Sequence, residues 1–146
     1  MTSTGDIPEA RVSKSGLDMY IPFAEKLGVR VVHRRVGDVG LELELLDEHM
    51  NSWEVAHGGV IMSVLDIVMG MSANSLDNAS KGATTIELKT NFIKAATGRI
   101  IARGLAHRAG RSLVFAEGEL RNDAQDLLAR ATGTFKLRYL RNESDK

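Results

Sequence analysis

The segment at 51–70 constrains this chain more than any other part of the sequence. It reads NSWEVAHGGVIMSVLDIVMG, so a Gly58-Gly59 pair opens a long apolar stretch with one acid, Asp66, in its middle. The apolar residues recur too densely for a surface helix with one apolar stripe, which predicts a helix buried on most sides. A carboxylate placed there costs roughly several kcal/mol unless it is partnered or neutral. Asp66 is therefore a candidate for chemistry, and the Gly-Gly start is a candidate oxyanion or phosphate site.

The composition favours one globular domain. We expect a flexible segment at 1–16, a single domain at 17–141 and a flexible tail at 142–146. Lys plus Arg (19) equals Asp plus Glu (19), and aromatic residues make up only 5% of the chain, so neither a basic field nor stacking rings favour nucleic acid as a partner. The lack of Cys excludes disulfides, thiolate-bound zinc and a Cys nucleophile, and it fits a cytoplasmic protein.

Neither a signal peptide nor a membrane span is expected. Residues 1–14 mix acidic, basic and polar side chains without an apolar centre. The long apolar stretch is interrupted by Ser63, Asp66 and Gly70 and falls short of a membrane span. The sequence therefore predicts a soluble domain without a membrane partner.

Hydrophobic periodicity predicts a helix, two strands, one long helix and four more strands. The first helix ends at Gly28, and the first two strands form a hairpin around Gly37-Asp38. The later strands are joined by short links, which favours an antiparallel sheet. One apolar helix and such a sheet can cover each other only if the sheet curls around the helix, an α+β architecture. The expected helices are 17–27 and 58–76, and the expected strands are 29–36, 39–46, 84–93, 99–109, 112–122 and 127–139.

The combination of Asn51, HGG at 57–59 and Asp66 resembles the hotdog-fold thioesterases, most closely the phenylacetic-acid-degradation (PaaI-like) type of acyl-CoA thioesterase. HGG alone is a weak signal, but together with the acid, the Asn and matching strands downstream it is a strong one. The likeness runs from about Leu17 to Leu140, and it includes TIELKTNFIKAA at 85–96 and GRSLVFAEGELRN at 110–122. It implies the hotdog fold, in which an antiparallel sheet wraps around one long central helix.

The resemblance also implies an activity, the hydrolysis of an aromatic or short- to medium-chain acyl-CoA without a cofactor. By this likeness the Gly58 N–H polarises the thioester carbonyl, with Asn51 close to the same site. Asp66 is the implied general base or nucleophile, and Thr85 stands where the family has a Ser or Thr that assists the water. Glu54 departs from the pattern, because many members carry Gly there, and it leaves the loop conformation and the substrate preference open.

These residue types suit the attack of water on a thioester. The attack places negative charge on the carbonyl oxygen, and a donor aimed at that oxygen contributes about 3–4 kcal/mol. Gly58 at a helix start supplies an unpaired N–H, the positive end of the helix dipole and room for close approach. Asp66 must be ionised to act, and we expect the apolar helix to raise its pKa.

The spacing between the two groups predicts a shared site. Eight residues of helix separate Gly58 from Asp66, a rise of about 12 Å, whereas base and oxyanion donor must both reach one reacting group. Two antiparallel copies of the helix about a two-fold axis would bring Gly58 of one chain against Asp66 of the other. We therefore expect a homodimer with two composite sites, and the resemblance suggests homotetramers built from such dimers.

CoA carries phosphates, so local basic residues should line its approach. The preferred candidates form one turn between two strands: Arg108, Gly110, Arg111 and Ser112. Lys94 and the pair Arg34-Arg35 are weaker candidates. As an alternative, Arg108 and Arg111 are solvated turn residues without a ligand.

Three of the candidates also have structural interpretations. Asp66 could be a core acid satisfied by a helix cap or by Asn74 of a neighbouring chain. His57 is a candidate for direct chemistry, but we expect it to brace the loop. Asn51 is as well suited to forming a turn as to contacting substrate.

Competing functions follow from the same fold. No histidine or carboxylate spacing typical of a metal site occurs, and no glycine-rich nucleotide loop follows a strand. One alternative is a non-catalytic acyl-CoA-binding regulator, which would gain nothing from a desolvated acid at the thioester. The other is an acyl-thioester hydratase or dehydratase, which needs an acid and a His paired at the carbon chain.

Overall fold

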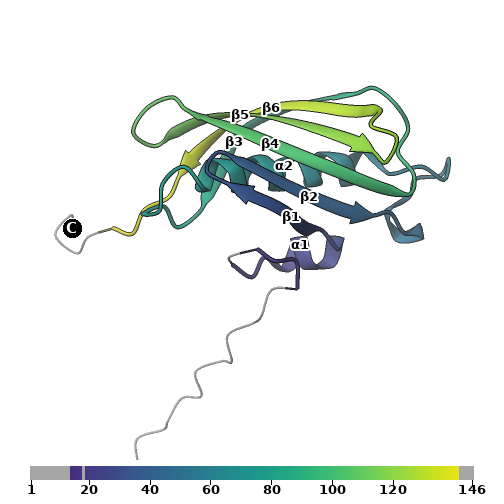
Figure 1. Ribbon diagram of the computed structural model, residues 1–146, viewed down its shortest axis with the longest axis horizontal. Helices are drawn as coiled ribbons and strands as arrows, with labels where there is room; N and C mark the ends of the chain where they lie inside the picture. The colour runs from purple at the N-terminus through teal and green to yellow at the C-terminus, as the bar shows by residue number, and fades with distance from the viewer. Residues whose placement is uncertain (1–13, 18, 142–146) are drawn as a thin grey trace, which may run out of the picture.

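The computed structural model describes residues 14–17 and 19–141, so most of the expected flexible segment at 1–16 and all of the tail at 142–146 lie outside the described residues. Within these described residues, two helices, one short 3-10 turn and six strands follow one another (Figure 1). Their bounds are α1 Pro22–Leu27, β1 Arg30–Arg35, β2 Asp38–Glu44, the 3-10 turn η1 Asp47–His49, α2 Gly58–Asn74, β3 Ala83–Phe92, β4 Arg99–Arg108, β5 Leu113–Asn122 and β6 Leu127–Leu137.

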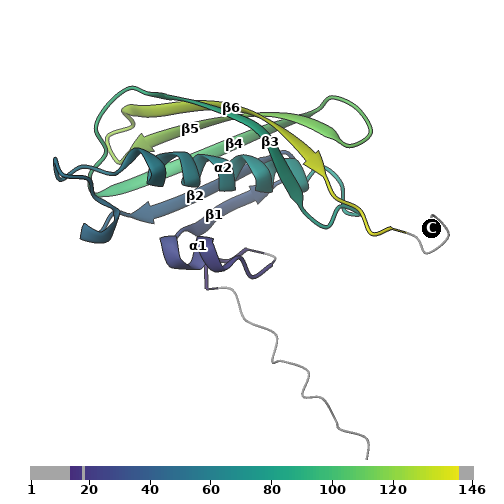
Figure 2. The same cartoon turned by 180° about the vertical axis from the view of Figure 1, so that it is seen from behind.

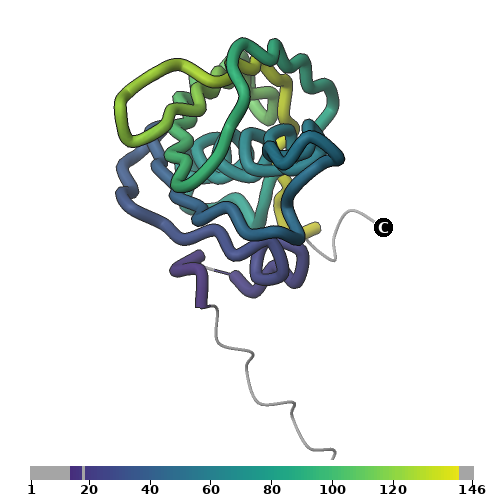
Figure 3. Tube along the Cα trace, turned by 90° about the vertical axis from the view of Figure 1, so that its right-hand side faces the viewer, coloured from purple at the N-terminus to yellow at the C-terminus, as the bar shows by residue number. Residues whose placement is uncertain are grey.

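The six strands form one antiparallel sheet in the order β1-β2-β4-β5-β6-β3. The sheet curls around α2, which lies along its concave face (Figures 2 and 3). The expected α+β architecture, a sheet wrapped around one long helix, is therefore confirmed. The β1–β2 hairpin and the antiparallel run of later strands are also confirmed. The strand order has a consequence for the site, because β3 directly follows α2 in sequence but forms an edge of the sheet.

The backbone of α2 lies very close to the sheet at Gly104 on β4. A Cβ atom at this position would lie 2.6 Å from the carbonyl oxygen of Val68, so only glycine fits. The buried Ser72 hydroxyl fixes the same contact, because it donates a 2.8 Å hydrogen bond to the Gly104 carbonyl. Together these contacts hold the backbone of α2 directly against β4.

The first helix is shorter than the periodicity predicts. It begins at Pro22 rather than Leu17, because the residue before a proline is pushed out of the helical region, and Ile21 is extended with φ −113° and ψ 103°. The end at Gly28 is confirmed, since Gly28 has φ +89° and its N–H bonds back to the Ala24 carbonyl. The segment before Pro22 is therefore free to lie alongside α2 instead of continuing the helix.

The long helix α2 is buried on one face only. The face toward the sheet is closed, while residues such as Asp66, Ile67 and Met71 on the other face are half-buried and Met62 is exposed. The expectation of a helix buried on most sides is therefore wrong for the single chain, because one sheet can cover only one side. Among the described residues, no helix is long and apolar enough to cross a membrane.

Candidate active site

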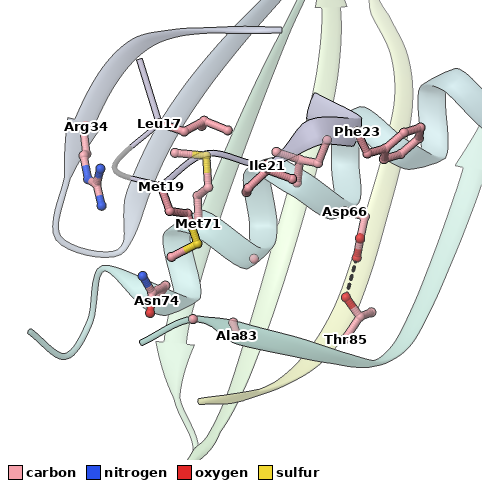
Figure 4. Close-up of a pocket in the computed structure, with 13 residues that line it drawn as sticks. Leu17, Met19, Ile21, Phe23, Arg34, Asp66, Met71, Asn74, Ala83 and Thr85 are labelled. Atoms are coloured by element: carbon pink, nitrogen blue, oxygen red, sulfur yellow. Dashed lines mark hydrogen bonds between the residues drawn. The ribbon is translucent and has the colours of Figure 1, made fainter. Parts of the chain in front are cut away.

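Asp66 and Thr85 form the centre of the candidate site. The Thr85 hydroxyl donates a 2.7 Å hydrogen bond to Oδ1 of Asp66, joining the middle of α2 to the edge strand β3 (Figure 4). Both residues line a pocket of about 260 Å³ between α2, the start of β3 and the segment that precedes and begins α1. One carboxylate oxygen is thus held by Thr85, and the carboxylate faces this pocket.

His57 is the N-cap of α2. Its backbone is extended, with φ −60° and ψ 138°, and its Nδ1 accepts a 2.8 Å hydrogen bond from the Gly59 N–H. A neutral ring with an accepting Nδ1 carries its proton on Nε2, so neither nitrogen is free to take a proton from water. This geometry favours the bracing role that we expected over direct chemistry.

Gly58 is the first helical residue, where an N–H has no intrahelical acceptor. A Cβ atom at Gly58 would lie 3.5 Å from the Phe92 ring, an ordinary contact, so packing within the chain does not require glycine there. Phe92 ends β3 and is exposed, so its ring lies beside Gly58 at the start of α2. Gly58 and Asp66 belong to one helix and lie about two turns apart, so one chain does not bring them together.

Asn51 shapes the loop that leads into α2. Its side-chain Oδ1 accepts the N–H of Trp53 at 2.9 Å and that of Val55 at 3.4 Å. The side-chain oxygen therefore forms the turn, which is one of the two roles expected for Asn51. The side-chain amide N–H groups remain as donors beside this role. Glu54 in the same loop has φ +58°, a left-handed conformation that glycine adopts most easily. The departure from the family pattern at Glu54 therefore falls on a position whose backbone favours glycine.

His49 is a residue that the sequence reasoning missed. It is only 5% exposed, its Nδ1 accepts the Leu46 N–H at 2.9 Å, and its carbonyl accepts the His57 N–H at 2.8 Å. Its Nε2 is buried without a hydrogen-bond partner among the described residues. His49 therefore fixes η1 to the residue that caps α2. The sequence offered one signal, a His eight residues before the HGG histidine, but nothing in one sequence marks it as buried.

The turn expected to bind CoA phosphates lies at the other end of α2 from Gly58. Arg108 is occupied within the chain, because its guanidinium contacts the carboxylate of Asp77, the Tyr139 hydroxyl and the carbonyls of Gly110 and Arg111. The N–H of Ala79 and the Tyr139 hydroxyl hold the pKa of Asp77 below its ordinary value, and Asp77 in turn raises the pKa of Tyr139. This network stabilises the turn.

The remaining basic candidates differ in their position and in their ion pairs within the chain. Arg111 is exposed in the turn, next to Ser112, and its guanidinium makes no hydrogen bond or ion pair with another described residue. Lys94 is paired with Asp126 at 2.7 Å, which lowers the pKa of that carboxyl. Arg34 lies on the wall of the Asp66 pocket. The structure therefore leaves Arg111 the freest cation of the preferred turn.

Comparison with known proteins agrees with this geometry. The sequence model of the thioesterase superfamily matches residues 54–129. An esterase-family protein of Archaeoglobus fulgidus is 30% identical over 112 residues, which cover 75% of this chain and 71% of the relative. The medium/long-chain acyl-CoA thioesterase YigI of Escherichia coli is 26% identical over 132 residues, 80% of this chain and 85% of the relative. The PaaI protein from the phenylacetic acid degradation operon of E. coli superposes with a TM-score of 0.73 at 18% identity, covering 79% of this chain and 83% of that protein.

Fold and site together define a hotdog thioester hydrolase, with a helix that begins HGG and carries an acid facing a pocket. The chain belongs to the thioesterase superfamily. The resemblance drawn from the HGG segment is thereby confirmed.

Proposed function

We propose that this protein is an acyl-CoA thioesterase in which Asp66 activates the water that cleaves the thioester. The observation that carries this proposal is the Asp66–Thr85 pair in a pocket on the helix that begins with HGG. The acyl-CoA substrate itself is suggested by the activity named for YigI, a relative that covers most of this chain. No metal or cofactor enters the proposed reaction.

The proposed mechanism uses the two carboxylate oxygens of Asp66 differently. Oδ1 accepts the Thr85 hydrogen bond and is held in place, which leaves Oδ2 to take a proton from water. The water oxygen bonds to the carbonyl carbon, and the oxyanion that forms is stabilised by the Gly58 N–H. When the C–S bond breaks, the CoA sulfur leaves with the electron pair and recovers the proton from Asp66. The products are the free acid and CoA.

We further propose that Gly58 and Asp66 of one site come from two chains. Gly58 and Asp66 are about two turns apart on one helix, too far to serve one carbonyl group. The face of α2 away from the sheet carries Asp66 and the exposed Met62, and the adjacent edge strand β3 exposes Ile86 and Phe92. An apolar helix face beside an unpaired strand edge is a surface suited to a second copy of the chain. In such a dimer the exposed Arg111 is our candidate for a CoA phosphate contact.

Thiol release from a panel of acyl-CoAs tests the proposed activity. We expect release with the wild type and a loss of about two to four orders of magnitude in kcat for Asp66→Asn, the range that general bases contribute. Binding of acyl-CoA without release would contradict hydrolysis and support a regulator, while addition of water to an enoyl-CoA would support a hydratase. Asp47→Asn is the matched control, because that exposed carboxylate lies outside the pocket.

A further inference from the structure

The pocket beside Asp66 has apolar walls and one polar end. Leu17, Met19, Ile21 and Phe23 form one wall, and Met71 of α2 lies on another (Figure 4). Ile67 of α2 also lines the pocket. Asn74 and Arg34 also line it, and Asn74 lies eight residues beyond Asp66 on α2, a rise of about 12 Å. The pocket therefore runs along the helix from the reacting carboxylate to a polar end.

These walls suit the acyl part of the substrate better than the CoA part. The pantetheine arm of CoA carries amide groups, and burying an amide without a hydrogen-bond partner is unfavourable by several kcal/mol, roughly. The wall formed by Leu17, Met19, Ile21 and Phe23 presents aliphatic, thioether and phenyl groups, which offer an amide no strong partner. An apolar acyl chain has no hydrogen bonds to lose when it enters this pocket, and the flexible side chains of Met19 and Met71 can adapt to its shape.

Gly70 forms the floor of this pocket. It lies four residues after Asp66 and four before Asn74, so it occupies the same helix face between them. A glycine inside a helix is destabilising relative to alanine. The fold does not require it here, because a Cβ atom at Gly70 would meet only the Phe135 ring at 3.5 Å, an ordinary contact. This differs from Gly104, where a Cβ atom would overlap the helix backbone. Packing therefore does not explain the glycine, whereas the pocket does, because a residue without a side chain leaves the floor of the pocket open.

We propose that Gly70 and Phe23 set the acyl specificity of this enzyme, and that the pocket takes an apolar, unbranched acyl chain of medium length. The carbonyl lies at Asp66, the chain passes over Gly70 between Phe23 and Met71, and its end stops before Asn74 and Arg34. The inference rests on the proposed thioesterase activity and names its substrate class. It also assigns a function to Leu17, Met19 and Ile21, which lie before the start of α1 at Pro22.

Two substitutions that change the pocket in opposite directions test the proposal. The measurement is kcat/KM for acetyl-, hexanoyl-, octanoyl-, decanoyl-, palmitoyl- and phenylacetyl-CoA, with the melting temperature of each variant. The wild type should prefer chains from hexanoyl to decanoyl. Gly70→Ala should melt higher than the wild type yet lose octanoyl relative to acetyl activity by roughly tenfold, the discrimination that one methylene gives. Phe23→Ala widens the pocket beside Met71 and should gain phenylacetyl relative to octanoyl activity by a similar factor.

Phe115→Ala is the matched control for Phe23→Ala. Phe115 is 55% exposed against 57% for Phe23, but it lies on β5 outside the Asp66 pocket, so its substitution should leave the acyl profile unchanged. Acyl profiles that neither pocket variant alters would overturn this inference while leaving the thioesterase proposal intact. A wild-type preference for phenylacetyl-CoA would overturn the assignment to an unbranched chain. Thiol release from none of the substrates would overturn the proposed activity itself. Because Gly70→Ala should be more stable than the wild type, the test does not depend on a variant that fails to fold.

Discussion

The Thr85 hydroxyl donates a 2.7 Å hydrogen bond to Oδ1 of Asp66, which joins the edge strand β3 to the middle of α2. The two residues are 19 apart in sequence and come from the two elements that border the pocket. The bond orients the carboxylate and leaves its second oxygen for water. The fold therefore fixes the orientation of the proposed base through this one contact between α2 and β3.

Removing the Thr85 hydroxyl should lower turnover more than it weakens binding. Thr85→Val keeps the shape of the side chain but leaves Asp66 free to rotate, and we expect kcat to fall about tenfold, the size of one charged hydrogen bond. KM should change little, because the hydroxyl serves the base rather than the substrate. Thr85→Ser retains the hydroxyl and should stay near the wild-type rate. Equal kcat for the Val and Ser variants would contradict the assignment.

Glu54 should be replaceable by glycine with a gain in stability. Its φ of +58° is a conformation that disfavours a residue with a Cβ atom, by about 1 kcal/mol. We expect Glu54→Gly to raise the free energy of unfolding by about 0.5–1 kcal/mol in urea titrations. Ser52→Gly in the same loop is the control, since Ser52 does not have a positive φ, and it should be neutral or destabilising. A loss of stability in Glu54→Gly would show that its side chain matters more than its backbone.

His49 should act as a positioning residue for the start of α2. His49→Phe fills the buried space but leaves the Leu46 N–H without its acceptor, which costs about 1–3 kcal/mol. We expect kcat to fall as well, because η1 no longer holds the residue that caps the helix. His49→Asn offers an oxygen in place of Nδ1 and should restore part of both stability and kcat. Urea unfolding and steady-state kinetics on the same three proteins separate these effects, and loss of stability with unchanged kcat would make His49 purely structural.

Asp38 should stabilise the fold in a pH-dependent way. Hydrogen bonds from Arg103 and His33 hold the pKa of Asp38 well below its ordinary value of 3.8. Because the folded pKa is depressed, the stabilisation is present above the unfolded value and is lost as pH falls through the folded one. Asp38→Asn should therefore be destabilised by about 1–3 kcal/mol at neutral pH, with the difference from the wild type shrinking below about pH 4. The exposed Glu48→Gln is the control, and a difference for Asp38→Asn that stays constant down to pH 2 would contradict this origin.

The sequence predicted the elements well because their signals are local. Strand ends agree to within about two residues where Gly or a short polar link interrupts the alternation, and the end of α1 follows from Gly28. The expected start of α1 at Leu17 is wrong because Pro22 keeps Ile21 extended, an effect that periodicity does not contain. The position of β3 at a sheet edge was not predictable, since it depends on pairing with β6, whose partner residues lie 37 (Phe92 to Ala129) to 54 (Ala83 to Leu137) positions later.

The site was predictable only in part. The family likeness singled out Asp66 and Thr85, and the structure brings them together. Arg108 illustrates the limit, because its partners Asp77 and Tyr139 are each 31 residues away and no local pattern connects them. The pocket wall formed by Leu17, Met19, Ile21 and Phe23 was not predictable for the same reason. Contacts between distant segments, rather than local patterns, decide which basic and apolar residues are free for a ligand.

Mixing two inactive variants tests the shared site most directly. Gly58→Pro removes the proposed oxyanion N–H at a helix position that proline favours, and the extended His57 before it is compatible with proline. Gly58→Ala keeps the N–H and serves as the control for added bulk. Gly58→Pro and Asp66→Asn should each be inactive alone.

Dimers formed from equal amounts of the two variants should recover roughly a quarter of the wild-type thiol release, because half of the dimers are mixed and each has one intact site. That site would combine Gly58 of the Asp66→Asn chain with Asp66 of the Gly58→Pro chain. No recovery, in mixtures shown to contain the mixed dimer, would place both groups in one chain and contradict the account.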